Sequence, residues 1–236
     1  MINLLVINPN SSQSVTKNLE SILVAPPEVK LHFYTAPPEA PKEISGTETS
    51  ISSAVICLPD LLQLQSSNNY DGFLVGCYSN HPLIESLAKN TKKPTLGIMQ
   101  ATLLYSILNP SISKLFILTS YAEWEPLLDA LVCDIVGNSP GQFPSQKFQK
   151  SKGLNVSVLS LADPTEFAKI ENRVTDILNG EYKNDNIDCI LLGCAGMAGL
   201  DTKLAASFPH IQFIDCLKVG VELLTSLVRF NHQLSS

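Results

Sequence analysis

The 236-residue sequence lacks the motifs that commonly mark metal, nucleotide and phosphate sites. It has no Cys-x-x-Cys pair and its four histidines are scattered, so no zinc site is indicated. It has no Gly-x-x-x-x-Gly-Lys-Ser/Thr loop for a nucleoside triphosphate. Gly193, Gly196 and Gly199 recur at every third residue, which differs from the dinucleotide fingerprint Gly-x-Gly-x-x-Gly. We therefore expect no metal, no nucleoside triphosphate and no dinucleotide bound through these motifs.

Long apolar runs and basic clusters are also missing. No run approaches the roughly 20 residues of a membrane helix. The net charge of -6 argues against nucleic acid or an acidic membrane as a partner. The first residues have the pattern of a strand and not of a signal peptide, and six cysteines without a secretion signal fit a reducing compartment. We expect a cytoplasmic protein that binds neither nucleic acid nor membrane.

Two short segments carry the same pattern, one in each half of the chain. Gly72–Cys77 and Cys189–Cys194 are apolar runs of strand length that end in Gly-Cys, and a helix-like stretch follows each. Such a cysteine is expected at the C-terminal edge of a parallel sheet, where open α/β proteins bind ligands. Two cysteines that approach one site from opposite sides suit the movement of a proton across a carbon centre.

The alternative for any single cysteine is burial as a small apolar side chain. The matched placement after glycine favours a functional role for Cys77 and Cys194. The cysteines without that placement are interpreted as packing residues: Cys57, Cys133, Cys189 and Cys216. A phosphatase-type thiolate needs an arginine soon after the cysteine, and neither Cys77 nor Cys194 has one.

Strand and helix patterns alternate along the chain and predict parallel sheets with right-handed crossovers. We expect strands near residues 2–7, 29–34, 95–98, 114–118, 156–159 and 212–214, besides those before Cys77 and Cys194. We expect helices near residues 14–23, 48–65, 83–89, 101–108, 121–132, 164–178 and 217–230, and a polar loop over 137–153.

The second half repeats the order of the first, which indicates a duplicated lobe. The offset from Leu4 to Phe116 is close to that from Cys77 to Cys194. The predicted fold class is α/β, with two similar, pseudo-symmetric lobes, each a mainly parallel sheet flanked by helices, and the active site in the cleft between them. Residues 1–112 form the first lobe and 113–216 the second, and the C-terminal helix 217–230 is expected to pack back on the first.

Four loops are expected to converge on that cleft, because they follow the C-terminal ends of the strands. They are Asn8–Ser12, Gly76–Asn80, Thr119–Ser120 and Gly193–Gly196. They are rich in amide, hydroxyl and glycine groups and contain no lysine or arginine. The sequence therefore predicts a small, polar and largely neutral ligand.

At these loops the chain resembles the aspartate/glutamate/hydantoin racemase superfamily, and most closely its hydantoin and allantoin racemase branch. The matching segments are Ile7–Ser12, Gly76–Tyr78, Gly193–Met197 and Ile214–Val221. The resemblance implies a cofactor-independent racemase of two α/β lobes in which Cys77 and Cys194 are the catalytic acid and base. It also implies a small cyclic ureide as substrate and a homo-oligomer as the assembly.

Two departures from the family's pattern place the chain in a divergent subgroup. Relatives often have an acidic residue and a proline soon after the first cysteine, where this chain has Asn80, His81 and Pro82. Relatives commonly have glutamate where this chain has Gln100. The subgroup is similar to proteins associated with nitrogen-regulated allantoin use in fungi.

The expected substrate-binding groups come from the same loops. Asn10, Ser79, Asn80 and Thr119 are predicted to hold the amide groups of the ring. Backbone amides of residues 76–79 and 193–196, including Ala195 and Gly196, are candidate donors to the oxygen on which charge develops. The alternative for the polar side chains is a turn or capping role.

The segments that follow both cysteines have the pattern of a helix start, which predicts lowered thiol pKa values, because a helix N-terminus stabilises a thiolate. His81 has two interpretations. It acts as an imidazolium beside Cys77, or it caps the helix that Pro82 begins.

Two other functions remain open from the residues alone. One is a decarboxylase or an isomerase of the same superfamily that uses a single cysteine. The other is a non-catalytic small-molecule binding protein on a racemase scaffold, which the residues at Asn80 and Gln100 leave open.

Overall fold

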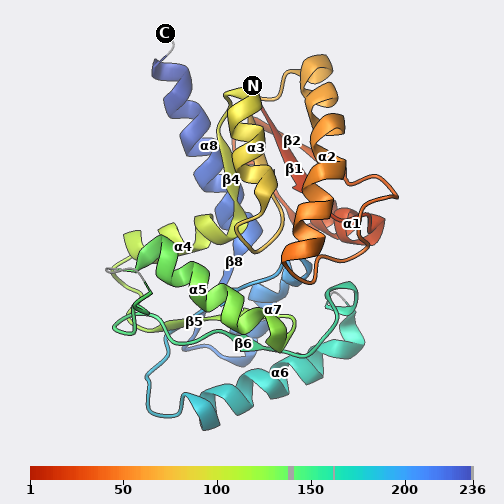
Figure 1. The fold of residues 1–236 in the computed structure, drawn as a ribbon. Helices are drawn as coiled ribbons and strands as arrows, with labels where there is room; N and C mark the ends of the chain where they lie inside the picture. The colour runs from red at the N-terminus through yellow and green to blue at the C-terminus, as the bar shows by residue number, and fades with distance from the viewer. Residues whose placement is uncertain (138–140, 162, 235–236) are drawn as a thin grey trace. The chain divides into compact units, whose positions relative to one another are not determined.

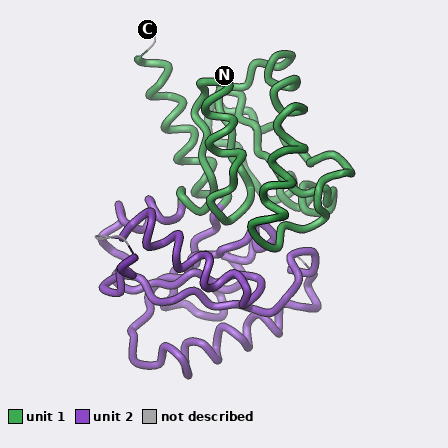
Figure 2. The backbone as a smooth tube through the Cα atoms, viewed as in Figure 1, with its two compact units in different colours: residues 1–101, 217–236 green, residues 102–216 purple. Residues whose placement is uncertain are grey.

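The computed structural model describes residues 1–137, 141–161 and 163–234. The chain divides into two compact units, shown in Figure 2. Unit 1 consists of residues 1–101 and 217–236, and unit 2 consists of residues 102–216. Each contains one parallel sheet of four strands, so the predicted α/β fold with two parallel sheets flanked by helices is confirmed.

Unit 1 has the strand order β2-β1-β3-β4, with all neighbours parallel. Its strands are β1 (Ile2–Asn8), β2 (Val29–Thr35), β3 (Gly72–Val75) and β4 (Thr95–Gly97). Its helices are α1 (Gln13–Ile22), α2 (Thr47–Asn68) and α3 (Pro82–Thr91). The chain passes between the units within α4 (Ile98–Leu108) and at the start of α8 (Cys216–Leu234).

Unit 2 has the equivalent strand order β6-β5-β7-β8, again all parallel. Its strands are β5 (Leu115–Thr119), β6 (Lys152–Gly153), β7 (Cys189–Leu192) and β8 (Gln212–Asp215). Its longer helices are α5 (Glu125–Val136), α6 (Phe167–Asp176) and α7 (Leu200–Ser207). Short 3₁₀ turns are η1 (Ala122–Trp124), η2 (Val158–Ser160), η3 (Pro164–Glu166) and η5 (Ala195–Met197), and a π turn is η4 (Ile177–Glu181).

Helices cover both faces of the unit 1 sheet, as Figure 1 shows. Alternate residues of β3 point to opposite faces. Phe73 packs in the cluster that lies against α2 and α3, while Leu74 lies beside Gly220 of α8. All four residues of β3 are buried, and so are all four of β7. A strand buried on both faces requires a continuous apolar run, which is the pattern visible in the sequence.

Backbone and carboxylate hydrogen bonds fix β3 against β1 at both ends. Asp71, directly before β3, accepts the backbone N–H of Asn3 through Oδ2 at 2.8 Å. Directly after β3, the N–H of Gly76 donates to the carbonyl oxygen of Ile7 at 2.8 Å. These two bonds set the register of β3, and therefore which way the residues that follow it face.

Unit 2 repeats this arrangement on β7. Asp188, directly before β7, accepts the N–H of Lys114 at 3.0 Å and that of Ser113 at 2.8 Å. Directly after β7, the N–H of Gly193 donates to the carbonyl oxygen of Leu118 at 2.7 Å. The two strands that precede Cys77 and Cys194 are therefore anchored in the same way.

The prediction of a strand at residues 156–159 is wrong. The strand that follows β5 along the chain is β6, which pairs with β5 at Thr119 and Gly153. The Ser157 hydroxyl instead accepts the N–H of Leu159 and caps the 3₁₀ turn η2. A serine side chain that bonds nearby backbone competes with a strand ladder, although the residues around it are apolar.

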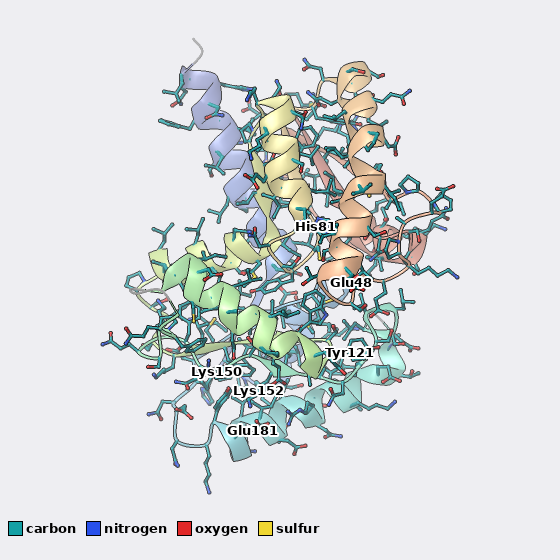
Figure 3. The ribbon with its side chains drawn as sticks, viewed as in Figure 1. Glu48, His81, Tyr121, Lys150, Lys152 and Glu181 are labelled. Carbon is teal, nitrogen blue, oxygen red and sulfur yellow. The ribbon has the colours of Figure 1, made fainter. Side chains whose placement is uncertain are left out.

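An ion-pair cluster joins β6 to the end of the α6 segment (Figure 3). Lys152 and Arg173 both contact Glu181, the latter at 3.0 Å from Nη2 to Oε1. The hydrogen bond from Lys152 lowers the pKa of the Glu181 carboxyl. The cluster thus adds side-chain contacts to a strand of only two residues.

His81 caps helix α3 (Figure 3). Its Nδ1 accepts the N–H of Leu83 at 3.3 Å, and Pro82 occupies the first helical position. The capping interpretation of His81 is thus confirmed. The side chain is 1 % exposed, and burial lowers its pKa to about 4, so it is neutral near pH 7 and the imidazolium interpretation is wrong.

We predict that this histidine makes the fold sensitive to acid. As pH falls from 6.5 toward 4, the unfolded chain binds a proton at His81 that the folded chain does not. Stability is therefore complete above pH 6.5 and falls by about 2–3 kcal/mol by pH 4.5. His81→Asn keeps an oxygen acceptor for the cap and removes the titration. Urea unfolding followed by circular dichroism at pH 7.5 and 4.5 measures the difference, and an equal pH dependence in both proteins would contradict the prediction.

Candidate active site

Cys77 is the first residue beyond the last backbone bond of β3 in unit 1. It follows Gly76, whose N–H is bonded to the end of β1, and it precedes the loop that leads to α3. The side chain is partly exposed, while its neighbours Tyr78 and Ser79 are buried. The thiol is therefore held at the C-terminal edge of the sheet, as the sequence pattern predicts.

The environment of the Cys77 thiol raises its pKa to about 11, because burial disfavours the thiolate. The Ser79 hydroxyl lies 3.3 Å from Sγ and acts in the opposite direction, but less strongly. The predicted lowering of this pKa is wrong. Helix α3 begins only at Pro82, so no helix N-terminus lies directly after Cys77 to stabilise a thiolate.

Asn80 is the exposed residue of this loop. Its Oδ1 accepts a hydrogen bond from Nε2 of Gln100 at 3.2 Å. Gln100 comes from the first turn of α4, directly after β4. The side chains of Ser79 and Asn80 thus make different contacts, Ser79 with the sulfur of Cys77 and Asn80 with the first turn of α4.

Asn10 lies in the loop after β1, also in unit 1. Its Oδ1 accepts the N–H of Ser12 at 2.9 Å, and its own N–H donates to Oδ1 of Asn8 at 3.3 Å. The side-chain oxygen Oδ1 of Asn10 therefore stabilises the turn, which was the alternative to ligand binding. Asn8 organises the loop further, since its Nδ2 donates to Thr16 Oγ1 and to the Ser12 carbonyl.

Cys194 occupies the equivalent position in unit 2. It follows Gly193 at the end of β7 and is 9 % exposed. Its carbonyl oxygen accepts the N–H of Met197, so it caps the 3₁₀ turn that begins at Ala195. A helical turn does begin directly after this cysteine, which distinguishes it from Cys77.

The other predicted residues of unit 2 are buried around this turn. Thr119 ends β5 and is 2 % exposed, and its carbonyl oxygen accepts the N–H of Leu154 at 2.8 Å. Ala195 is 7 % exposed. Gly196 packs against η2, where an added Cβ would lie 2.8 Å from the carbonyl oxygen of Val158. Glycine at this position therefore permits a close approach of two turns.

None of the remaining cysteines follows a glycine at the end of a central strand: Cys189 begins β7, Cys216 follows Asp215 of β8, and Cys57 and Cys133 lie on α2 and α5. Burial raises the pKa of the Cys189 thiol to about 12, and burial also raises the pKa of Cys57. Cys216 is 1 % exposed, and Cys133 lies on α5 with partial exposure. None of the six cysteines forms a disulfide.

Sequence reasoning did not single out Asp215 of unit 2. It ends β8, is 3 % exposed, and its Oδ2 accepts the N–H of Gly199 at 2.9 Å. It therefore holds the loop that carries Cys194. The sequence signal for Asp215 is an acidic residue at the end of a short apolar strand. In the sequence it was noted only as one residue of the segment Ile214–Val221, which resembles the family.

Among the described residues, no three His, Cys, Asp or Glu side chains are arranged to hold a metal ion. Over the same part of the chain, no helix is long and apolar enough to cross a membrane.

Three comparisons place these features among known proteins. The chain is 32 % identical to Protein DCG1 of Saccharomyces cerevisiae over 96 % of each chain. It is 25 % identical to a hydantoin racemase of Rhizobium meliloti, over 94 % of this chain and 87 % of the relative. Among solved structures, an allantoin racemase from Klebsiella pneumoniae superposes with a TM-score of 0.82 at 22 % identity, covering 98 % of this chain and 89 % of that one.

A family model described as Asp/Glu/Hydantoin racemase matches residues 4–224, which include both strand-end cysteines. With two parallel sheets of equivalent strand order and a Gly-Cys at the end of the same strand in each, the chain belongs to the Asp/Glu/hydantoin racemase family.

Proposed function

We propose that this protein is a cofactor-independent racemase of a small cyclic ureide of the hydantoin or allantoin type. The observation that carries the proposal is the equivalent placement of Cys77 and Cys194. Each follows a glycine whose N–H bonds to the end of the first strand of its own sheet. Membership of the racemase family and the hydantoin and allantoin racemases among the relatives support the same assignment.

The proposed chemistry is a two-base proton transfer. One sulfur, as thiolate, takes the proton from the ring carbon beside a carbonyl, and the electron pair of the C–H bond moves to the carbonyl oxygen. The other sulfur, as thiol, returns a proton to the opposite face, so the two sulfurs exchange protonation states. The proposal requires that both sulfurs reach the same carbon atom.

The charge that develops on the carbonyl oxygen needs hydrogen-bond donors. The N–H groups of Ala195 and Gly196 begin a helical turn, and N–H groups at that position have no acceptor within the turn. We assign them this role. Asn10, Ser79, Asn80 and Thr119 are proposed to bind the ring's amide and carbonyl groups.

The environment of Cys77 suits the acid role in the resting protein. With its pKa raised to about 11, this sulfur is a thiol at pH 7 and has a proton to give. In the opposite direction it must act as the thiolate, which a bound substrate and the Ser79 hydroxyl would have to stabilise.

We predict that Cys77→Ser and Cys194→Ser each abolish racemisation, with a loss of at least about 10³-fold, because a serine hydroxyl is a far weaker acid than a thiol and its anionic form, the base, is not accessible near pH 7. Each variant retains exchange of the ring proton for deuterium in one enantiomer only, because one base remains. Polarimetry and proton NMR in D₂O measure the two rates. Cys133→Ser, which changes a cysteine on α5, is the matched control. Near-normal racemisation by either active-site variant would exclude the mechanism, and release of CO₂ from a carboxylated substrate would favour a decarboxylase.

The raised pKa gives a second prediction. Only the thiolate reacts with iodoacetamide, so alkylation of Cys77 accelerates about tenfold per pH unit between pH 7 and 10. Mass spectrometry of the Cys77 peptide at several times measures the rate, and a saturating concentration of allantoin slows it. A rate that levels off at pH 8.5 would mean that the thiol has an ordinary pKa.

The charge of the loops gives a third prediction. Residues 8–12, 76–80, 119–120 and 193–196 contain no lysine or arginine to bind a carboxylate. Allantoin and 5-substituted hydantoins are therefore expected to turn over at least about tenfold faster, in kcat/KM, than free aspartate or glutamate. Circular dichroism of each pure enantiomer over time measures the rates, and faster racemisation of either amino acid would refute the assignment.

A further inference from the structure

Gln100 makes a contact that its place on α4 alone does not explain. Its Nε2 donates to Oδ1 of Asn80 at 3.2 Å, across twenty positions of sequence. Both residues belong to unit 1, Gln100 in the first turn of α4 and Asn80 in the loop that carries Cys77. The bond thus joins the end of β4 to the exposed end of the cysteine loop.

The other end of the Gln100 amide occupies the space above Gly97. A Cβ built on Gly97 would lie 2.1 Å from Oε1 of Gln100 and 2.4 Å from Cδ1 of Ile84. Oε1 is buried, and no described residue donates a hydrogen bond to it. The absence of a side chain at Gly97 is therefore what allows the Gln100 carbonyl to lie there.

This packing distinguishes the two ends of the Gln100 amide. An oxygen at the buried end faces the Cα hydrogen of Gly97, which is a weak donor. An NH₂ group at that end would leave two strong donors buried without an acceptor, which is the costlier arrangement. Gln100 therefore presents its NH₂ group to Asn80, as the structure has it.

Unit 2 has a counterpart to this contact. Gly97 ends β4 as Asp215 ends β8, and each pairs with the last residue of the strand beside it, Val75 and Leu192. The carboxylate of Asp215 reaches the N–H of Gly199 in the loop that carries Cys194. In each unit, therefore, a side chain at or just beyond the end of the fourth strand bonds to the loop of the cysteine.

We infer that Gln100 is a positioning residue that fixes the Asn80 amide with its NH₂ group outward. Because Oδ1 of Asn80 is occupied by Gln100, Nδ2 is the group left to meet a ligand, and no described residue accepts from it. The loop of Cys77 then selects a substrate with a hydrogen-bond acceptor at this point. A ring carbonyl of a ureide is such an acceptor, and this last step rests on the proposed function.

Gln100→Glu reverses the arrangement, because a carboxylate only accepts hydrogen bonds. Asn80 must then rotate its amide to donate to residue 100, and it presents Oδ1 outward. A ligand carbonyl then loses the Nδ2 donor of Asn80 and faces Oδ1, which cannot donate a hydrogen bond. We expect KM for allantoin to rise about fivefold with kcat within twofold of the wild type.

The inference requires that Gln100 acts through Asn80. Asn80→Ala is expected to raise KM by a similar factor, and Gln100→Glu in the Asn80→Ala background is expected to add less than twofold. Gln63→Glu makes the same chemical change at an exposed position of α2 and should leave KM unchanged. A fivefold effect of Gln100→Glu that persists without the Asn80 side chain would overturn the inference.

A ligand-free measurement separates this inference from the proposed function. In ¹⁵N NMR of the whole chain, the Gln100 Nε2 protons should shift upfield in Asn80→Ala, because they lose their acceptor. The Asn80 Nδ2 protons should exchange quickly with water in the wild type and more slowly in Gln100→Glu.

Unchanged Gln100 signals, or Asn80 Nδ2 protons already protected in the wild type, would overturn the assigned orientation whether or not a ureide is turned over. If these signals behave as expected and no ureide is racemised, the proposed function fails and the orientation of Asn80 stands.

Discussion

The arrangement of the candidate active site depends on one backbone hydrogen bond that occurs twice. The N–H of Gly76 donates to Ile7 in unit 1, and the N–H of Gly193 donates to Leu118 in unit 2. Each closes the ladder between the central strands of its sheet, so the next residue is the first without a strand partner. That residue is a cysteine in both units. Each thiol is thus attached directly to the hydrogen-bonded end of a buried central strand.

Burial of the strand end has an electrostatic cost. A cysteine at the end of a buried strand is surrounded by low-dielectric protein, and the Cys77 thiol is correspondingly hard to ionise. His81, four residues further on, is kept neutral for the same reason. The Cys77 loop therefore contributes neutral hydrogen-bonding groups near pH 7, and reactivity in a two-base mechanism would have to come from the bound substrate.

The parts of the fold that could be read from the sequence are those set by apolar patterning. Buried parallel strands such as β3 and β7 are continuous apolar runs, and their Gly-Cys ends were visible without a structure. Local side-chain hydrogen bonds were visible only in part: the cap at His81 was predicted from the Pro82 that follows it, and the cap at Ser157 was not. The cap at Ser157 places a 3₁₀ turn where the apolar pattern predicted a strand. Helix α3 begins at Pro82, close to the predicted position, and so provides no helix N-terminus directly after Cys77. The contacts of Gln100 and Asp215 join residues distant in sequence, so no local pattern indicated them.

The aspartates that precede β3 and β7 fix the length of chain between an anchor and a cysteine. We call this segment a spacer; it runs from Asp71 to Cys77 in unit 1 and from Asp188 to Cys194 in unit 2. Asp71 and Cys77 are separated by the same number of residues as Asp188 and Cys194, and both ends of each spacer are anchored to a neighbouring strand. Inserting or deleting one residue inside a spacer would break an anchor or turn the thiol to the other face of the sheet, because side chains alternate along a strand. An apolar substitution within one of these strands therefore leaves the thiol where it is, whereas a change in the strand's length moves it.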